Sequence, residues 1–301
     1  MKTLFFAQPH ARPHLTELST AQRIFDFNAH FYLMGVLNIT PDSFSDGGQF
    51  FDPDQAVAHG LAMAQAGADM IDIGGESTRP GAAPISADQE CARVIPVIKA
   101  LSDAFAQNPE RPTPIISIDT SKAAVADAAL NAGAQIVNDI SGLGFDPDMP
   151  AVVARHQAAL ILMHIRGTPR TMQTDTNYND LIKEIHDYFS QRIALAQNAG
   201  VARERIILDV GIGFGKSVAQ NYQLVRELYR FFDLELPILL GPSRKSFLGH
   251  ILDKPADQRL FGSAAAVACG LMAGANIVRV HDVEAMHDVL RITEAIAGCP
   301  I

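Results

Sequence analysis

The chain has 301 residues, 48% of them hydrophobic, which is enough for a substantial core in one large domain or two small ones. Its formal net charge of −9 argues against binding to nucleic acid or a membrane surface, so an anionic substrate would need a local cluster of Lys, Arg or metal. The widely spaced Cys91, Cys269 and Cys299 lack metal-ligand spacing, and no stretch has transmembrane length, so we expect a cytoplasmic protein in a reducing compartment.

Residues 1–30 show weak periodicity and are predicted to form an N-terminal arm or a short hairpin. Residues 32–37 then form a short apolar run without helical spacing, which predicts a strand buried on both faces. This strand ends at Asn38, and the segment Thr40-Pro41-Asp42-Ser43 favours turns because Pro41 has no backbone donor. A loop rich in oxygen ligands is therefore expected directly after the strand.

From this strand onward, strands and helices are predicted to alternate. Helices are expected where apolar residues recur at helical spacing, for example after Ser86, where Gln89 completes a capping box. The further strands are expected at residues 68–73, 115–118, 135–137, 159–163, 205–208, 236–240 and 276–278. The helices are expected at residues 54–66, 86–107, 123–131, 150–156, 179–198 and 217–232, within 246–273, and at 283–297.

Eight strands, each followed by a helix at a spacing that suits right-handed crossovers, predict a (β/α)8 TIM barrel of the α/β class. A doubly wound open sheet is the alternative, but five or six strands would satisfy it, and unbroken alternation favours closure. No linker or composition shift divides residues 31–301, so we predict one barrel domain there, preceded by the arm.

A polar group follows each predicted strand. These groups are Asn38, Thr78 and Arg79 in the run Glu76–Arg79, Asp119, Asn138, His164, Asp209, Lys245, and Arg279 with His281. A polar residue can simply end a strand, and for His164 a packing role is the simpler interpretation. In a barrel, however, the carboxyl ends of all strands meet at one face, so the groups are expected to form one pocket.

The polar groups suggest what such a pocket binds. Asp119, Asn138 and Asp209 suit a flat heterocycle that presents an edge of N–H donors. Cationic side chains could gather on an anion such as a phosphate, and they are Arg79, Lys245, Arg279 and His281. Asn38 and Asp46 offer hard oxygen ligands suited to Mg2+, which keeps several waters and bridges to substrate phosphates. This chemistry predicts displacement of a phosphate leaving group beside a heterocycle.

The run Gly211-Ile212-Gly213-Phe214-Gly215-Lys216 is similar to a nucleotide-binding loop but fits neither the dinucleotide fingerprint nor Walker A. We expect instead a loop where the backbone approaches a ligand, with Phe214 as an apolar wall. Phe44, in the first loop, is expected to cover a ligand when that loop closes.

Seven motifs resemble dihydropteroate synthase when read in chain order, from about Leu33 to Asp282. They are MGVLNITPDSFSDGG, DIGGESTRPGA, SIDTSK, IVNDISG, GFGK, SRKSFLG and RVHD. The resemblance implies a pterin-binding barrel and a transferase of folate biosynthesis, of a kind that sulfonamides target. It would join 6-hydroxymethyl-7,8-dihydropterin diphosphate to 4-aminobenzoate and release pyrophosphate.

The resemblance also implies roles for individual residues. Those at the pterin and diphosphate are Thr78, Asp119, Asn138, Met163, Asp209, Gly213, Lys245, Arg279 and His281. Those at the 4-aminobenzoate site are Phe44, Pro80, Phe214 and Ser246. Asn38 would bind Mg2+, and the catalytic group would be Asp46, Arg79 and Lys245, with Asp46 ordering the first loop over the leaving group.

The implied reaction is a dissociative, Mg2+-assisted displacement in which a cationic methylene is delocalised into the dihydropterin. The family also implies a homodimer built on the outer helices. One departure is Val210, where the family has proline, and this exchange could loosen the loop that carries Phe214.

Two alternatives to the synthase remain. A cobalamin-dependent pterin methyltransferase would need no diphosphate cluster, so Thr78, Arg79, Arg279 and His281 count against it. A non-catalytic pterin-binding paralogue would lose the chemistry of the first loop, which the presence of Asn38 and Asp46 argues against.

Overall fold

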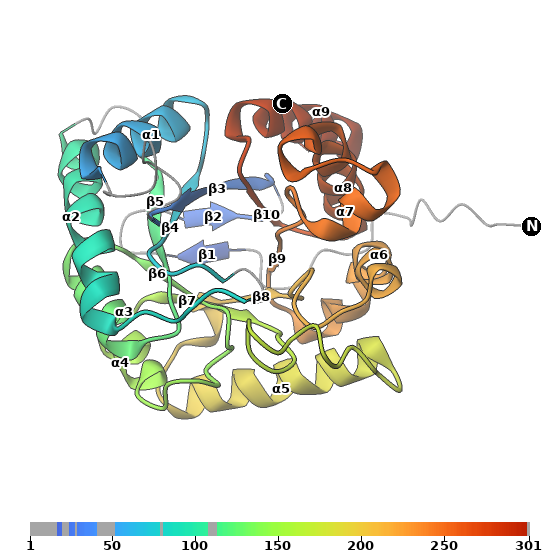
Figure 1. Ribbon diagram of the computed structural model, residues 1–301, viewed down its shortest axis with the longest axis horizontal. Helices are drawn as coiled ribbons and strands as arrows, with labels where there is room; N and C mark the ends of the chain where they lie inside the picture. The colour runs from blue at the N-terminus through green and yellow to red at the C-terminus, as the bar shows by residue number, and fades with distance from the viewer. Residues whose placement is uncertain are drawn as a thin grey trace, which may run out of the picture.

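The computed structural model describes residues 17–19, 24–27, 29–40, 52–78, 81–107 and 113–299. Eight parallel strands close into a barrel in the order β10-β3-β4-β5-β6-β7-β8-β9, and helices surround it (Figure 1). The barrel strands are β3 (Tyr32–Asn38), β4 (Met70–Gly74), β5 (Ile115–Asp119), β6 (Ile136–Asp139), β7 (Ala159–Met163), β8 (Ile206–Asp209), β9 (Ile238–Leu240) and β10 (Ile277–Val280). The predicted (β/α)8 barrel is confirmed.

Helices follow every barrel strand. The α-helices are α1 (Pro53–Gln65), α2 (Ala87–Ala106), α3 (Ala123–Asn131), α4 (Met149–His156), α5 (Leu181–Asn198), α6 (Val218–Arg226), α7 (Ser246–Leu252), α8 (Leu260–Ala273) and α9 (Val283–Ala297). Short 3-10 helices are η1 (Arg203–Arg205), η2 (Leu228–Leu234) and η3 (Ala256–Gln258). The capping box of Ser86 and Gln89 is present at the start of α2.

Most predicted boundaries differ from the structure by one or two residues, and two of the differences have a clear physical reason. The helix expected over residues 217–232 is α-helical only to Arg226 and continues as η2, where the buried Phe231 packs edge-on against Phe189. The strand expected over residues 236–240 begins only at Ile238. Pro237 has no N–H to give to the ladder, so the strand can start only after it.

The strands bury both faces, as expected for a barrel. One set of alternate residues packs outward into the helix-lined core. The other set points inward, and its lower layer forms a separate apolar cluster of Tyr32, Met34, Met70, Ile115, Ile136, Ala159, Ile161, Ile207, Leu239 and Ile277 with Phe25 and Phe27. Most of these residues are the first in their strands. The amino end of the barrel interior is therefore filled with apolar side chains.

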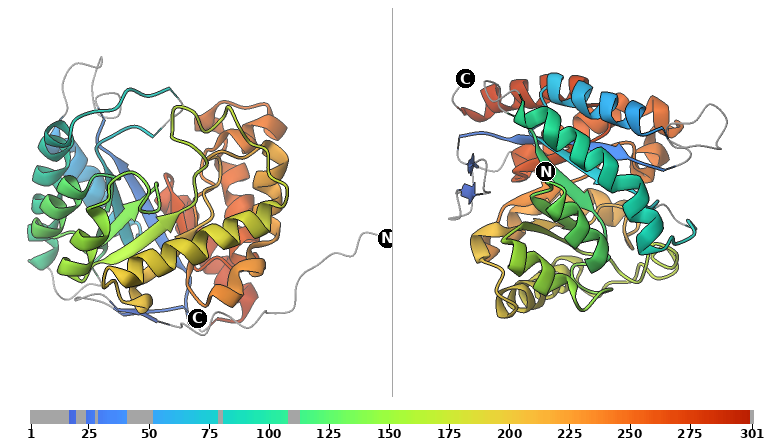
Figure 2. Two further views of the ribbon diagram at one scale, coloured as in Figure 1. Left: turned by 90° about the horizontal axis from the view of Figure 1, so that it is seen from below. Right: turned by 90° about the vertical axis from the view of Figure 1, so that its left-hand side faces the viewer.

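An antiparallel pair of short strands closes this end. β1 (Glu17–Ser19) pairs with β2 (Ile24–Asp26), and Figure 2 shows the pair beneath the barrel, across the mouth at which the strands begin. Phe25 and Phe27 are buried, and their rings meet Tyr32 edge-on at centroid distances of 4.8 and 5.4 Å. Among the described residues, apolar side chains thus fill the amino end of the barrel, and polar groups gather at its carboxyl end. The division of the chain at residue 30 stays a prediction.

Candidate active site

A pocket of about 320 Å3 opens at the carboxyl ends of the barrel strands. Its walls come from the ends of β3, β4, β5 and β10 and from the loops after β7, β8 and β9. The pocket brings together most of the predicted site residues that the structure describes: Asn38, Thr78, Asp119, Gly213, Phe214, Lys245, Ser246, Arg279 and His281. The predicted convergence of strand ends on one site is therefore present.

The other predicted residues divide into two groups. Asn138, Met163 and Asp209 are buried at the ends of β6, β7 and β8. Met163 belongs to a small apolar cluster that Phe214 joins from the pocket wall. The remaining predicted residues, Phe44, Asp46, Arg79 and Pro80, lie outside the described residues.

Asp72, which the sequence analysis did not single out, joins these groups. It is fully buried in β4 and points inward with Met70 and Gly74. Its Oδ2 accepts hydrogen bonds from Arg279 Nε at 2.6 Å and from Asn138 Nδ2 at 2.9 Å. The signal that could have identified it is a carboxylate inside the apolar run Met70–Gly74, at a position whose side chain points into the barrel.

Arg279 bridges two carboxylates across the barrel. Besides its bond to Asp72, its Nη2 donates to Asp119 Oδ2 at 2.8 Å. The guanidinium was expected to face a diphosphate, whereas here its charge is balanced from within the barrel. Arg279 therefore also holds Asp119 and Asp72 in fixed positions at the pocket floor.

The floor contains unused hydrogen-bond acceptors. Among the described residues, Asp72 Oδ1, Ser117 Oγ and Asn138 Oδ1 are buried side-chain atoms without a hydrogen-bond partner. Asp72 and Ser117 are paired in register on neighbouring strands. Buried polar atoms without partners are unfavourable, so this layer suits donors supplied by a ligand or by ordered water.

Burial tunes the ionisable groups of the pocket. It raises the pKa of Asp119 to about 7, against the opposing effect of Arg279, and it also raises the pKa of Asp209. It lowers the pKa of Lys245 to about 8, although Asp209 favours the charged form. Burial and then the nearby Arg279 lower the pKa of His281 to about 4. His281 is thus neutral at pH 7 in the ligand-free pocket, and its expected role at an anionic group stays a prediction.

The loop after β8 forms one wall of the pocket. Lys245 Nζ donates to the Ile212 carbonyl and lies 4.7 Å from the centre of the Phe214 ring. Val210, the departure from the family pattern, is fully buried in the outer core. The loop is therefore anchored by packing and side-chain hydrogen bonds that do not require proline at position 210.

The loop after β4, which carries Thr78, is anchored by buried charges. Lys122 Nζ lies 2.5 Å from both Glu76 Oε2 and Glu90 Oε2, and Glu90 is fully buried in α2. Glu76 Oε1 also accepts from the Ile85 N–H at 3.1 Å. These contacts connect the ends of β4 and β5 to the start of α2.

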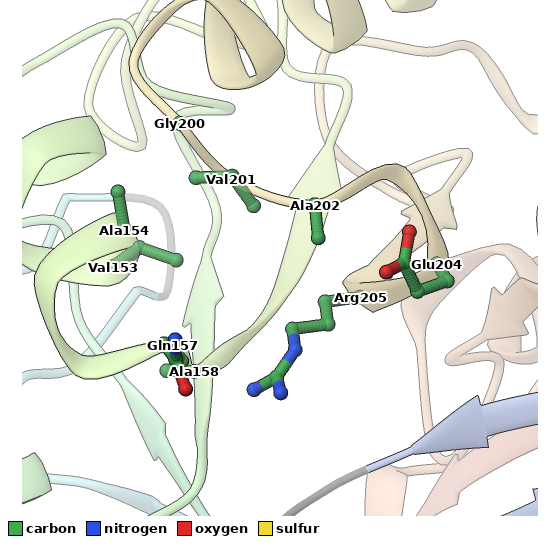
Figure 3. Close-up of a pocket in the computed structure, with 9 residues that line it drawn as sticks. All are labelled: Val153, Ala154, Gln157, Ala158, Gly200, Val201, Ala202, Glu204 and Arg205. Carbon is green, nitrogen blue, oxygen red and sulfur yellow. The ribbon is translucent and has the colours of Figure 1, made fainter.

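A second cavity has a volume of about 250 Å3, and Figure 3 shows the residues that line it. It is lined by the end of α4 and by the segment that leads into β8, including Gln157, Glu204 and Arg205. Because these residues precede their strands, the cavity lies at the amino side of the barrel. The polar strand ends do not reach it, so the pocket at the carboxyl face is the candidate active site.

The chain is similar to known pterin enzymes along most of its length. Residues 34–281 match the family model described as "Pterin binding enzyme". A dihydropteroate synthase from Synechocystis sp. is 50% identical over 280 residues, which cover 93% of this chain and 94% of that protein.

Solved structures show the same likeness. The Yersinia pestis dihydropteroate synthase with a sulfonamide drug has a TM-score of 0.87 and 42% identity, and the match covers 94% of this chain and 99% of that one. The Xanthomonas albilineans dihydropteroate synthase in complex with 7,8-dihydropteroate has a TM-score of 0.82 and 38% identity, covering 94% of this chain and 100% of that one.

Proposed function

The chain belongs to the dihydropteroate synthase family of pterin-binding enzymes. On that premise we propose a role in the reaction for each residue of the pocket. The enzyme is a transferase of folate biosynthesis. It condenses 6-hydroxymethyl-7,8-dihydropterin diphosphate with 4-aminobenzoate and releases 7,8-dihydropteroate and pyrophosphate. The observation that carries the assignment of roles is the pocket floor, where buried acceptors gather at the ends of adjacent strands.

The pterin binds at this floor through its N–H edge. Asp119, Asn138 and Asp209 are its polar partners, and Met163 packs near the ring. Asp72 supports them, because it holds both Asn138 and Arg279 in place. A floor of buried acceptors discriminates strongly against a ligand without matching donors, since unpaired acceptors would stay desolvated.

The diphosphate lies above the pterin, near Thr78, Arg79 and His281. Among the described residues, no group of three His, Cys, Asp or Glu side chains could hold a metal ion. Asn38 nevertheless places an amide at the pocket wall, and this donor set fits Mg2+, which takes few protein ligands and completes its shell with water and phosphate. When bound there, Mg2+ would neutralise charge on the departing pyrophosphate.

Bond breaking precedes bond making in this proposal. As the bond from carbon to the diphosphate oxygen breaks, the positive charge on the methylene spreads into the dihydropterin, beside the carboxylates of Asp119 and Asp209. The aniline nitrogen of 4-aminobenzoate is neutral at pH 7 and attacks with its lone pair, then loses a proton. Phe214 and Ser246 position this second substrate, so much of the rate comes from orientation.

Pyrophosphate release tests the function directly. The protein is incubated with dihydropterin diphosphate, with and without 4-aminobenzoate, in Mg2+ and then in EDTA. We expect release that depends on both Mg2+ and 4-aminobenzoate. If a folded protein binds the pterin but releases no pyrophosphate under any condition, it is a non-catalytic pterin-binding paralogue instead.

The active form is a homodimer that pairs the outer faces of α8 and α9. Large apolar side chains stand exposed on these two neighbouring helices: Phe261 at 83%, Met272 at 40%, Ile292 at 64% and Ile296 at 71%. Ile292 and Ile296 are one helical turn apart and so share a face. Such a patch is unfavourable in water and suits a second copy of the same surface.

Among the described residues no helix is both long and apolar enough to cross a membrane.

The expected location is the cytoplasm. Cys91, Cys269 and Cys299 form no disulfide among the described residues, as is usual in a reducing compartment.

A further inference from the structure

Lys216 is a buried lysine that the sequence analysis did not assign. Only 3% of its surface is exposed. Its Nζ lies 2.9 Å from His164 Nδ1, 3.2 Å from the His164 carbonyl oxygen and 2.9 Å from the Phe214 carbonyl oxygen. None of these partners is a carboxylate, and burial lowers the pKa of Lys216 well below its usual value. The terminal amino group instead contacts polar groups from two loops, those after β7 and β8.

His164 is suited to receive this contact. Burial and the charge of Lys216 lower its pKa well below the usual value, so the imidazole is neutral and can accept at Nδ1. The ring also packs edge-on against Tyr188 at a centroid distance of 4.8 Å. His164 is thus a fixed anchor at the end of β7, in agreement with the packing role expected from the sequence.

The loop after β8 is held at four successive carbonyl oxygens. Ile212 accepts from Lys245, Gly213 from Gln173, Phe214 from Lys216 and Gly215 from Tyr178. The glycines at 211, 213 and 215 all have positive φ. This left-handed backbone explains the nucleotide-like glycine pattern without a nucleotide, because it lets the loop turn its carbonyls toward these donors.

Among the four donors, Lys216 differs from the rest because it is 3% exposed and acts on the residue that carries the aromatic ring of the pocket wall. Gln173 is exposed and Tyr178 is half-buried, and they hold the glycines on either side. Lys216 instead holds the backbone of Phe214, the aromatic wall of the pocket. Removing the amino group would leave two carbonyl oxygens and an imidazole nitrogen without this hydrogen-bond partner.

We propose that Lys216 is a positioning residue for 4-aminobenzoate: by tying the Phe214 carbonyl to His164, it sets the wall against which this second substrate packs. The inference rests on the proposed function in taking Phe214 to line the 4-aminobenzoate site. Two partners of the pterin edge, Asp119 and Asn138, lie away from this loop, and the third, Asp209, meets it at the Gly211 N–H rather than at Phe214. Lys216 therefore affects the two substrates unequally.

The test is Lys216→Met, a change that keeps the length of the side chain and removes its donors. The matched control is Lys183→Met on the exposed face of α5, where the lysine contacts only Asp187. In steady-state assays with both substrates varied, we expect the KM for 4-aminobenzoate to rise about tenfold or more in Lys216→Met. The KM for the dihydropterin diphosphate should stay within about threefold, and the control should match the parent.

A double-mutant cycle shows whether Lys216 acts through the wall. In Phe214→Ala, which lacks the ring, adding Lys216→Met should raise the KM for 4-aminobenzoate no further. Equal increases in both KM values, or fully additive effects in the double variant, would overturn the proposal, because they would indicate general structural damage.

Hydrogen exchange tests the contact without relying on activity. The amides of Gly211, Gly213 and Phe214 donate to Asp209 Oδ1, Asn221 Oδ1 and the Gly211 carbonyl oxygen, and they should exchange faster in Lys216→Met. Unchanged exchange would also overturn the proposal. If Lys216→Met does not fold, Lys216→Gln keeps a shorter donor and should show a smaller change of the same kind. If the parent protein makes no product, the proposed function fails, and exchange still decides whether Lys216 holds the loop.

Discussion

Arg279 shows that a single residue at this site can position its neighbours before a substrate binds, in addition to its expected role at the substrate. Its guanidinium holds Asp72 and Asp119 together, while burial keeps the pKa of Asp119 near 7 and that of Lys245 near 8. Both groups therefore titrate close to neutral pH. A buried ion pair of this kind fixes the positions of its side chains more than it stabilises the fold, because desolvation offsets much of the attraction.

The pH dependence of kcat/KM for dihydropterin diphosphate should reveal both groups. Asp119, with a pKa raised to about 7, gains a proton and loses its charge as the pH falls below that value. Lys245, with a pKa lowered to about 8, loses its charge as the pH rises. We expect a bell-shaped profile with limbs near these values. Lys245→Arg, which stays charged, should remove the alkaline limb, whereas a flat profile from about pH 6 to about pH 9 would contradict these assignments.

Asp209 should be necessary for pterin binding but not for folding. The change Asp209→Asn preserves shape and removes the charge of a buried group whose Oδ1 accepts from the Gly211 N–H at 2.8 Å. Pterin affinity, measured by titration of the purified protein, should fall about a hundredfold, with little change in melting temperature. Asp233→Asn on the surface, beside His186, is the control. Unchanged pterin affinity in Asp209→Asn would remove Asp209 from the proposed site.

At the scale of an element, the loop after β8 and the end of α9 each depend on a glycine, for different reasons. Gly211 has a φ of +69°, and a Cβ there would lie 2.0 Å from the His164 carbonyl oxygen. Gly298, after α9, has a φ of +76°, but a Cβ there would meet no atom within 4 Å. The first glycine is required by conformation and by close approach, and the second by conformation alone.

These two glycines provide a matched pair of substitutions. Gly298→Ala should lower the free energy of unfolding by about 1 kcal/mol, the usual cost of a left-handed alanine. Gly211→Ala should lower it by about 3 kcal/mol or more, because the loop must also move away from β7. Urea unfolding of the two variants and the parent measures the difference. Equal losses in both variants would show that the loop relaxes freely.

Other elements were predicted closely because their signals are local. The capping box at Ser86 and the helix over residues 123–131 depend on residues within a few positions of one another. The transition from α6 to η2 was missed, because there the burial of Phe231 against a distant helix decides the backbone path.

At the scale of the whole molecule, the barrel is apolar at one end and polar at the other. Phe25 and Phe27 close the amino end, while carboxylates, amides and cations occupy the carboxyl end. The same separation leaves the outside of the barrel to the helices, of which α8 and α9 expose apolar side chains. The active site, the aromatic side chains that close the amino end and the proposed dimer surface thus lie on different faces of the molecule.

The proposed dimer can be tested by introducing one charged residue on its expected surface. Phe261→Glu places a carboxylate at the most exposed large apolar side chain of α8. It should convert a dimer to a monomer in analytical ultracentrifugation, because a buried unpaired charge is strongly unfavourable at an interface. Ile24→Glu changes an equally apolar, exposed residue on β2, and this control should remain dimeric. A parent protein that sediments as a monomer would refute the assembly.

The sequence by itself determined the barrel, the strand ends that meet in the pocket and the family, because short-range periodicity and contiguous motifs carry that information. Only the tertiary structure decided which groups pair inside the site. Arg279 meets Asp72 and Asp119 from 207 and 160 residues away, and Lys216 is buried between two loops that local patterns cannot bring together. Charge states such as that of neutral His281 depend on the same closure. Burial and long-range contacts set hydrogen-bond partners and pKa values, and both exist only once the barrel has closed.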